Sequence, residues 1–184
     1  MKKFYAFLFL ALALVPVNSY AKGGGGGGWL LGVDLAPVSS KTESTTSGVT
    51  GTSESSSTVY DISLGNVMGS GLYLGALYSS QNDKSDSSTT TTATAMGASV
   101  GFIGDSGFNI IASYILSATN ADYKKGTGYQ IDLGWRHFLS SSFYMGTKIS
   151  MRSVKYTENE TLSSGFESLT YSTTIPYVVL GFGF

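Results

Sequence analysis

The sequence predicts an all-β chain that folds as a closed, eight-stranded antiparallel up-and-down barrel. Large apolar side chains recur at every second residue in eight segments, and short and long connections between these segments alternate strictly. Charged residues make up only 12% of the 184 residues, against roughly 25% in an average soluble domain. Cysteine is absent and the net charge is -1, which excludes a disulfide scaffold, a thiolate metal site and a strongly basic nucleic-acid-binding protein.

The N-terminal residues have the features of a secretory signal peptide. Two lysines precede an apolar run over residues 4–15, and small residues form a cleavage site that ends at Ala21. The run is shorter than the about 20 apolar residues of a membrane-spanning helix, although a retained N-terminal anchor is the alternative. We expect a cleaved signal peptide at residues 1–21, a flexible glycine-rich segment at 22–28 and the barrel domain at 29–184.

The eight segments each show the alternation of a strand with one apolar face. They span residues 29–36, 60–65, 72–79, 96–102, 108–116, 129–136, 143–152 and 178–184. The apolar positions run from Trp29 to Leu35, Tyr60 to Leu64, Leu72 to Tyr78, Met96 to Phe102, Phe108 to Leu116, Tyr129 to Trp135, Phe143 to Met151 and Val178 to Phe184. The positions between them carry mostly Gly, Ala, Ser and a few charged residues, and no segment of comparable length has the i, i+3, i+4 spacing of an amphipathic helix.

The connections predict two different rims. Short turns near residues 69–70, 104–107 and 140–142 join the second strand to the third, the fourth to the fifth and the sixth to the seventh. The other connections are predicted as four long Ser/Thr-rich loops, near residues 39–57, 80–92, 117–127 and 156–170. Transmembrane barrels have this asymmetry, with an even number of strands and short turns on the periplasmic side. Both barrel termini are then expected on that side.

Charged residues within the eight segments all occupy the positions between the apolar ones. They are three acids and three bases, namely Asp34, Asp61, Asp132, Arg136, Lys148 and Arg152. In the narrow lumen of an eight-stranded barrel such a balanced set can pair through charge-assisted hydrogen bonds, whereas an unpaired charge would cost several kcal/mol. We therefore predict a structural charge network in the lumen, with Asp132 roughly opposite Lys148 on the neighbouring strand.

The apolar face, by contrast, carries no charge, as a wall against lipid requires. A Lys or Arg at mid-depth on that wall would cost about 2–4 kcal/mol. A soluble barrel with an apolar interior is the alternative, but its outer face would carry many charges spread along it. The pattern favours a transmembrane barrel. A filled lumen is the first interpretation of the polar face, and a narrow, porin-like ion conduit is the second.

Aromatic residues cluster where the two rims of such a barrel are expected, as in the interfacial girdles of membrane proteins. One group lies near the short turns, namely Trp29, Trp135, Phe138, Phe143, Phe182 and Phe184; the other lies near the long loops, namely Tyr60, Tyr78, Tyr114, Tyr129 and Tyr171. The β-propensity of aromatic residues is the alternative explanation.

The rhythm of strands and connections, together with two local motifs, resembles the small eight-stranded outer-membrane barrels of the OmpX and OmpA transmembrane-domain kind. The stretch GWRHFLSSSFYM at residues 134–145 is similar to a strand–turn–strand segment of that superfamily. The ending YVVLGFGF, with Tyr177, Leu180, Phe182 and Phe184, is similar to the C-terminal signal read by the outer-membrane assembly machinery. The resemblance implies residence in a Gram-negative outer membrane, among its lipids and lipopolysaccharide, with that machinery as a partner during biogenesis.

No residue pattern points to catalysis, a metal or a cofactor. A lipid A deacylase of this size would place His and Ser two residues apart near the outer leaflet, but His137 is followed by Leu139 and lies at the short-turn end. Acidic residues outside the eight segments lack the spacing of metal ligands. We expect a non-enzymatic monomer with no nucleic-acid partner and a role in envelope structure or surface interaction through its loops. A narrow ion-conducting pore and a lipid A-modifying enzyme are the alternatives.

Overall fold

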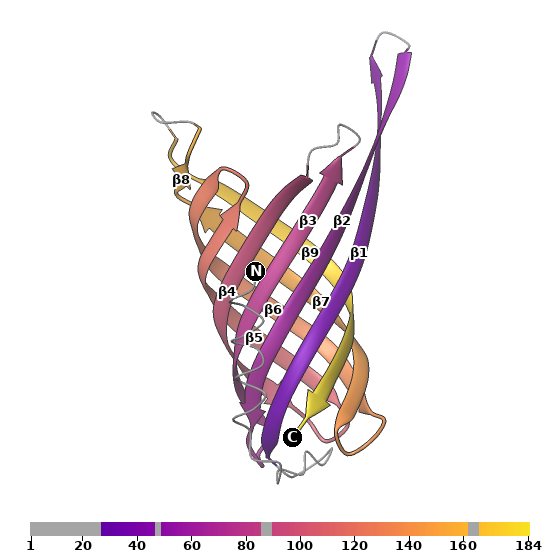
Figure 1. The fold of residues 1–184 in the computed structure, drawn as a ribbon, viewed down its shortest axis with the longest axis vertical. Helices are drawn as coiled ribbons and strands as arrows, with labels where there is room; N and C mark the ends of the chain where they lie inside the picture. Colours follow the sequence, from indigo (N-terminus) through magenta and orange to yellow (C-terminus); the bar gives the residue numbers. More distant parts are fainter. Residues whose placement is uncertain (1–26, 47–48, 86–89, 162–165) are drawn as a thin grey trace.

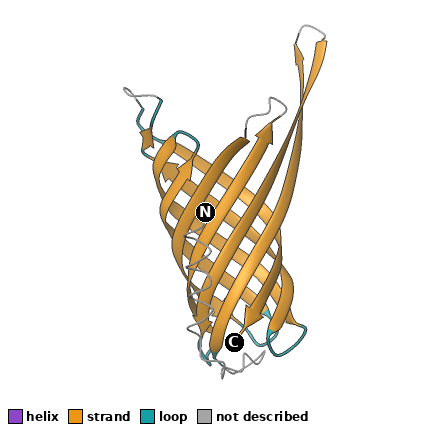
Figure 2. Ribbon diagram, in the orientation of Figure 1, coloured by secondary structure: helices purple, strands orange, loops and turns teal. Residues whose placement is uncertain are grey.

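Eight long antiparallel strands close into a barrel in the computed structural model, which describes residues 27–46, 49–85, 90–161 and 166–184 (Figures 1 and 2). The strands are β1 (Gly28–Thr46), β2 (Val49–Val67), β3 (Leu72–Ser85), β4 (Thr90–Ile103), β5 (Phe108–Asn120), β6 (Tyr123–Phe138), β7 (Phe143–Tyr156), β8 (Glu158–Asn159) and β9 (Leu169–Gly183). Consecutive strands pair from β1 to β7, β7 pairs with β9, and β9 pairs with β1 to complete the cylinder. The two-residue β8 pairs only with the start of β6. The predicted eight-stranded up-and-down barrel is confirmed.

Both ends of the barrel domain meet at the rim that carries the short turns, which we call the short-turn end. The backbones of Trp29 and Phe184 exchange two hydrogen bonds there, with N···O distances of 2.8 and 2.9 Å. The turns at 68–71, 104–107 and 139–142 lie at the same end. The predicted signal peptide and most of the predicted glycine-rich segment lie outside the described residues, and Gly28 already belongs to β1. None of the described residues forms a helix long and apolar enough to cross a membrane.

The opposite rim, which we call the hairpin end, differs from the prediction of four long loops. β1 and β2 continue as a paired hairpin through most of residues 39–57 and project beyond the other strands (Figure 1). Strands likewise occupy most of 80–92 and 117–127, so that only the connection over 157–168 is long. The prediction of long loops is therefore wrong at three of the four connections. Alternation of apolar residues stops where Ser and Thr begin, but the backbone ladder continues, and Thr is a residue that favours extended backbone.

Apolar side chains fill the lumen on both sides of its middle. Toward the short-turn end, one buried cluster consists of Leu30, Tyr73, Ile103, Ile111, Tyr144 and Val179. Toward the hairpin end, two further clusters comprise Ala95, Ile115, Ala118, Val154 and Tyr156, and Ala36, Val59, Ile175 and Tyr177. An eight-stranded barrel is just narrow enough for side chains to fill it in this way.

Two tyrosine rings in the short-turn cluster fit because glycines face each other beneath them. Gly32 on β1 is paired with Gly181 on β9, and the ring of Tyr144 covers this pair. A Cβ at Gly181 would overlap both that ring and the backbone carbonyl of Leu31. Tyr73 lies in the same way against Gly65. The small residues of the lumen face therefore serve as seats for large rings.

We predict that Gly181→Ala lowers the free energy of unfolding by about 1–3 kcal/mol, because overpacking forces a buried ring and its neighbours to shift. Urea titration of the folded protein in detergent micelles, followed by tryptophan fluorescence, measures the change. The matched control is Gly104→Ala in the β4–β5 turn, where the nearest atom to the added Cβ is a Phe102 ring carbon at 3.3 Å. Equal losses for the two variants would contradict the predicted role of the glycine pair.

Candidate functional site in the barrel lumen

The two faces of the barrel wall differ sharply in chemistry. Large hydrophobic side chains point outward on all eight long strands, and typical members such as Leu74, Val100 and Ile149 are 44%, 50% and 52% exposed. Five of the six charges predicted for the lumen are buried there, since Asp34, Asp61, Asp132, Arg136 and Lys148 are at most 7% exposed. The sixth, Arg152, also points inward, with 11% of its side chain exposed. The charges predicted for the lumen therefore lie inside, and large hydrophobic side chains cover the exterior.

Lys148 lies at the centre of the buried charges. Its Nζ is 2.7 Å from Asp34 Oδ2, 3.2 Å from Asp132 Oδ2 and 3.3 Å from Asp61 Oδ2. An ammonium group has three donors, so three carboxylates match its hydrogen-bonding capacity. Nζ also lies 4.6 Å from the centroid of the Tyr177 ring. One cation on β7 thus joins carboxylates from β1, β2 and β6.

Arg152 extends the network toward the hairpin end. Its Nη2 donates to both carboxylate oxygens of Asp61 at 3.0 and 3.1 Å, its Nη1 donates to Ser79 Oγ at 2.7 Å, and its Nε donates to Gln130 Oε1 at 2.7 Å. The amide of Gln130 in turn donates to Asp132 at 2.9 Å and to Asp61 at 3.2 Å. The planar guanidinium and the amide thereby supply the donors that a fully buried carboxylate such as Asp61 requires.

Arg136 stands apart from these residues. Its guanidinium lies 5.3 Å from the centroid of the Tyr144 ring, nearer the short-turn end. Within the described part of the chain, its Nη1 has no hydrogen-bond partner, and neither does Asp34 Oδ1. We define the charge network as the other five charged residues together with Ser79, Gln130 and Tyr177, whose hydroxyl lies 3.4 Å from Asp61 Oδ1.

The register between β6 and β7 differs from the prediction. Asp132 is paired with Ser150, and Lys148 is paired with Gly134, so the two residues predicted to lie roughly opposite each other are offset by two positions. The connecting turn is centred on Ser141, with Phe138 paired to Tyr144. The long Lys148 side chain nevertheless spans the diagonal and contacts Asp132, as diagonal neighbours in a sheet can do.

Most predicted girdle aromatics point outward. Trp29, Trp135, Phe182, Tyr114, Tyr129 and Tyr171 are exposed; Tyr60, Tyr78 and Phe143 are partly exposed on the same face; and Phe184, at the chain end, is partly buried. Phe138 is different, because it is opposite the fully buried Tyr144 and its ring centroid lies 5.4 Å from that of Tyr144. Opposite residues share a face of the sheet, so Phe138 belongs to the interior packing and its assignment to the girdle is wrong.

The residues of the predicted assembly signal divide between the two faces. Phe182 is exposed on the outer face, and Leu180 and Phe184 have the same parity. Tyr177 has the opposite parity and is 3% exposed in the lumen.

Sequence reasoning missed Ser79, Gln130 and Tyr177 as network members. The signal that could have found them is parity, since all three occupy the lumen-facing positions of their strands.

His137 and the serines after it have simple structural surroundings. His137 is exposed and is paired with Met145 near the short-turn end. Ser140 Oγ accepts a hydrogen bond from the Phe143 amide at 3.0 Å, as a turn residue does. Among the described residues, no group of three or more His, Cys, Asp or Glu side chains is arranged to hold a metal ion. The three lumen carboxylates surround the Lys148 ammonium instead.

Chemically, the lumen holds three acids and, with Arg136, three bases, enclosed between apolar clusters. Beside Arg152, toward the hairpin end, there is a hollow of about 20 Å³ with Ser79, Thr94 and Tyr156 in its wall. Such a hollow has room for about one water molecule. The charges therefore crosslink strands within a packed interior.

The fold and the lumen define the class of this protein as a closed, eight-stranded antiparallel up-and-down barrel with an apolar exterior and a polar, side-chain-filled interior. Comparison with protein-family models gave no match, and comparison with curated proteins gave none either.

We predict strong energetic coupling between Lys148 and Asp34. Lys148→Met leaves three buried carboxylates without their shared cation and lowers the free energy of unfolding by about 3–5 kcal/mol. Because Asp34→Asn removes one of those carboxylates, the double variant loses less than the sum of the single losses, with a coupling of about 0.5–3 kcal/mol. Urea titration of the four proteins in micelles measures the cycle.

The control cycle uses Lys125→Met and Glu158→Gln, which remove an ion pair with the same 2.7 Å separation but with side chains 75% and 46% exposed. Exposed pairs of this kind are screened by water and salt, so we expect no measurable coupling there. Additive losses at Lys148 and Asp34 would show that burial does not distinguish the two pairs.

Proposed function

We propose that the chain is an integral β-barrel protein of the Gram-negative outer membrane, without enzymatic activity, that acts in envelope structure or in surface interaction. The observation that carries this proposal is the distribution of side chains, with large hydrophobic residues exposed on all eight long strands and charges buried inside. Soluble monomers rarely expose contiguous apolar patches larger than a few hundred Å². A surrounding of hydrocarbon removes the cost of such a surface.

Closure of the sheet supports the same environment. Every long strand has a hydrogen-bonded neighbour on both sides over at least part of its length, so most of its edges are paired and not open to lipid, which cannot solvate them. The short turns and both ends of the barrel domain share one rim. In the proposed orientation this rim faces the periplasm, the hairpin end faces the exterior, and outer-membrane lipids and lipopolysaccharide surround the wall.

The filled lumen favours a structural role over the alternative of a narrow ion conduit. The members of the charge network bond to one another, and apolar clusters pack on both sides of it. An ion crossing the lumen would have to displace buried side chains such as Tyr73 and Tyr144, which are at most 1% exposed.

The hairpin end is where a surface interaction would take place. The β1–β2 hairpin projects farthest from the barrel (Figure 1). The segment after β7 is tied to the start of β6 by the Lys125–Glu158 pair and to the β5–β6 turn by a 2.7 Å hydrogen bond from Thr161 to Asp122. Binding residues are often carried by such extensions of a rigid scaffold. The likeness to OmpX- and OmpA-type barrels supports recognition by the outer-membrane assembly machinery and a monomeric state.

Insertion into a membrane is tested by placing a charge on the outer wall. Ala98 is an exposed outer-face residue five positions from the short-turn end of β4, so it lies about 13 Å up a band that is about 25 Å tall. We predict that Ala98→Arg costs about 2–4 kcal/mol of folding stability in phospholipid vesicles. Urea titration of tryptophan fluorescence in those vesicles measures the loss.

Thr92→Arg is the matched control, because Thr92 has the same parity on the same strand but lies about 28 Å from the short-turn end, beyond the band. We expect little change for it. An outer wall that faces water would tolerate both substitutions equally, and that result would refute the proposal. In cells, the protein should follow the outer-membrane fraction on a density gradient.

The closed lumen is tested by recording from planar bilayers. Purified protein should insert without producing a stable conductance, because packed side chains block the axis of the barrel. Lys148→Met, which weakens the packing at the centre of the lumen, is recorded in the same way as a second sample. A steady conductance from the unaltered protein would favour the ion-conduit alternative.

A further inference from the structure

The barrel wall is not equally continuous at every seam, that is, at every junction between two neighbouring strands. β1 and β9 are joined by only six residue pairs, from Leu30–Gly183 to Leu35–Val178, whereas each of the other seven seams has ten or more. β1 continues beside β2 to Thr46, and β9 continues beside β7 back to Leu169. Beyond the sixth pair, therefore, both strands go on but no longer bond to each other (Figure 1).

Two prolines explain where this ladder stops. Extending the register by two residues would place Pro37 directly opposite Pro176. Proline has no amide hydrogen, so neither residue can donate a bond across the seam. Because both residues are prolines, the break leaves no N–H group of theirs without a partner in an apolar medium, which makes the break tolerable there.

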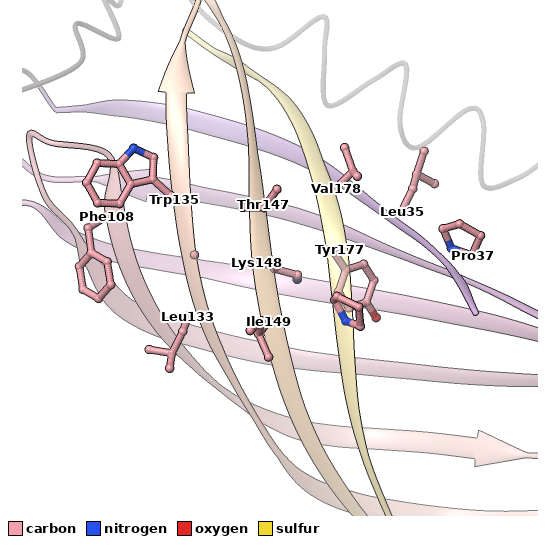
Figure 3. A pocket seen from close by; sticks show the side chains of 12 residues that line it. Leu35, Pro37, Phe108, Leu133, Trp135, Thr147, Lys148, Ile149, Tyr177 and Val178 are labelled. Carbon is pink, nitrogen blue, oxygen red and sulfur yellow. The ribbon is translucent and has the colours of Figure 1, made fainter. Parts of the chain in front are cut away.

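A groove of about 610 Å³ lies on the outer wall at this break (Figure 3). Leu35 and Val178, the last bonded pair, form one side, and Leu133, Trp135 and Ile149 form the other, with the smaller Thr147 between them. All five large side chains are between 38% and 52% exposed. The volume falls within the roughly 300–1,000 Å³ of ordinary ligand sites.

The floor of the groove is made by residues that belong to the lumen. Tyr177 and Lys148 both line it, although each is at most 7% exposed. Tyr177 keeps its ring against the Lys148 ammonium and its hydroxyl near Asp61. An occupant would therefore meet a mostly apolar wall with the buried Tyr177 and Lys148 beneath it.

From this geometry we propose that the groove holds one acyl chain of a phospholipid, an inference that rests on the proposed membrane location. The groove is continuous with the apolar outer wall, and its lining is almost entirely apolar. Its lining residues lie within nine positions of the short-turn ends of their strands. The groove extends past the middle of the wall to Pro37, but at its other end Phe108 and Trp135 lie zero and three positions from the short-turn ends of β5 and β6. In the proposed orientation this end opens toward the periplasmic leaflet, which points to phospholipid rather than lipopolysaccharide as the source of the chain.

The test uses the full barrel in phospholipid vesicles that contain a trace of phosphatidylcholine with a photoreactive diazirine midway along one acyl chain. After irradiation, peptide mass spectrometry locates the labelled residues. We expect label to be enriched at Leu35, Val178 and Ile149 over the outer-face residues Leu74 and Val100 on the opposite wall.

Thr147→Trp fills the groove and should reduce labelling there roughly tenfold, as expected if it displaces about two methylene groups of the chain. Ala98→Trp, on the outer face of β4, should leave the labelling of the groove unchanged. Even labelling around the barrel, or an unchanged pattern in Thr147→Trp, would overturn the proposal while leaving membrane insertion intact. Absence of label from every strand would instead refute the membrane location itself.

Discussion

The rest of the barrel depends on the buried ion pairs between the ammonium of Lys148 and its three carboxylates. Their partners come from β1, β2 and β6, so a single side chain on β7 ties together strands that are far apart in the sequence. A buried ion set is stable only when every member is matched, because each unmatched charge keeps its desolvation penalty. The donors of Arg152 and Gln130 on Asp61 are the additional bonds that this requirement calls for.

Sealing the charges away from water has consequences for the neighbouring layers. Apolar clusters pack on both sides of the network, and the tyrosines of the short-turn cluster need glycines beneath them to fit. The lumen therefore uses its smallest residues where its largest rings lie. The same alternation that directs these residues inward directs Leu, Ile, Val and aromatic side chains outward, so that one period of two residues defines both the interior and the exterior.

That two-residue period is also why the sequence predicts which side chains face the lumen and which face outward. A residue's parity within a strand places Asp34, Asp61 and Lys148 on the lumen side whatever the register, because side chains alternate strictly. The register itself depends on the centre of a turn, and the serines at 140–142 do not reveal it. The extent of β1 and β2 was hidden because their polar halves lack apolar alternation. Phe138 was misplaced because an aromatic near a rim suits either face, and only its pairing with Tyr144 decides.

The short seam between β1 and β9 joins the first long strand of the chain to the last. Asp34 lies on β1 and Tyr177 lies on β9, and both contact Lys148. The central cluster therefore cannot be completed until the two ends of the barrel domain have met. Parting them would remove Asp34 from the central cation, whereas Tyr177 would stay beside it because β9 remains paired with β7. Closure of the cylinder and neutralisation of its interior are thus a single cooperative event, which makes a half-closed intermediate electrostatically costly and sharpens the transition between open and closed chains.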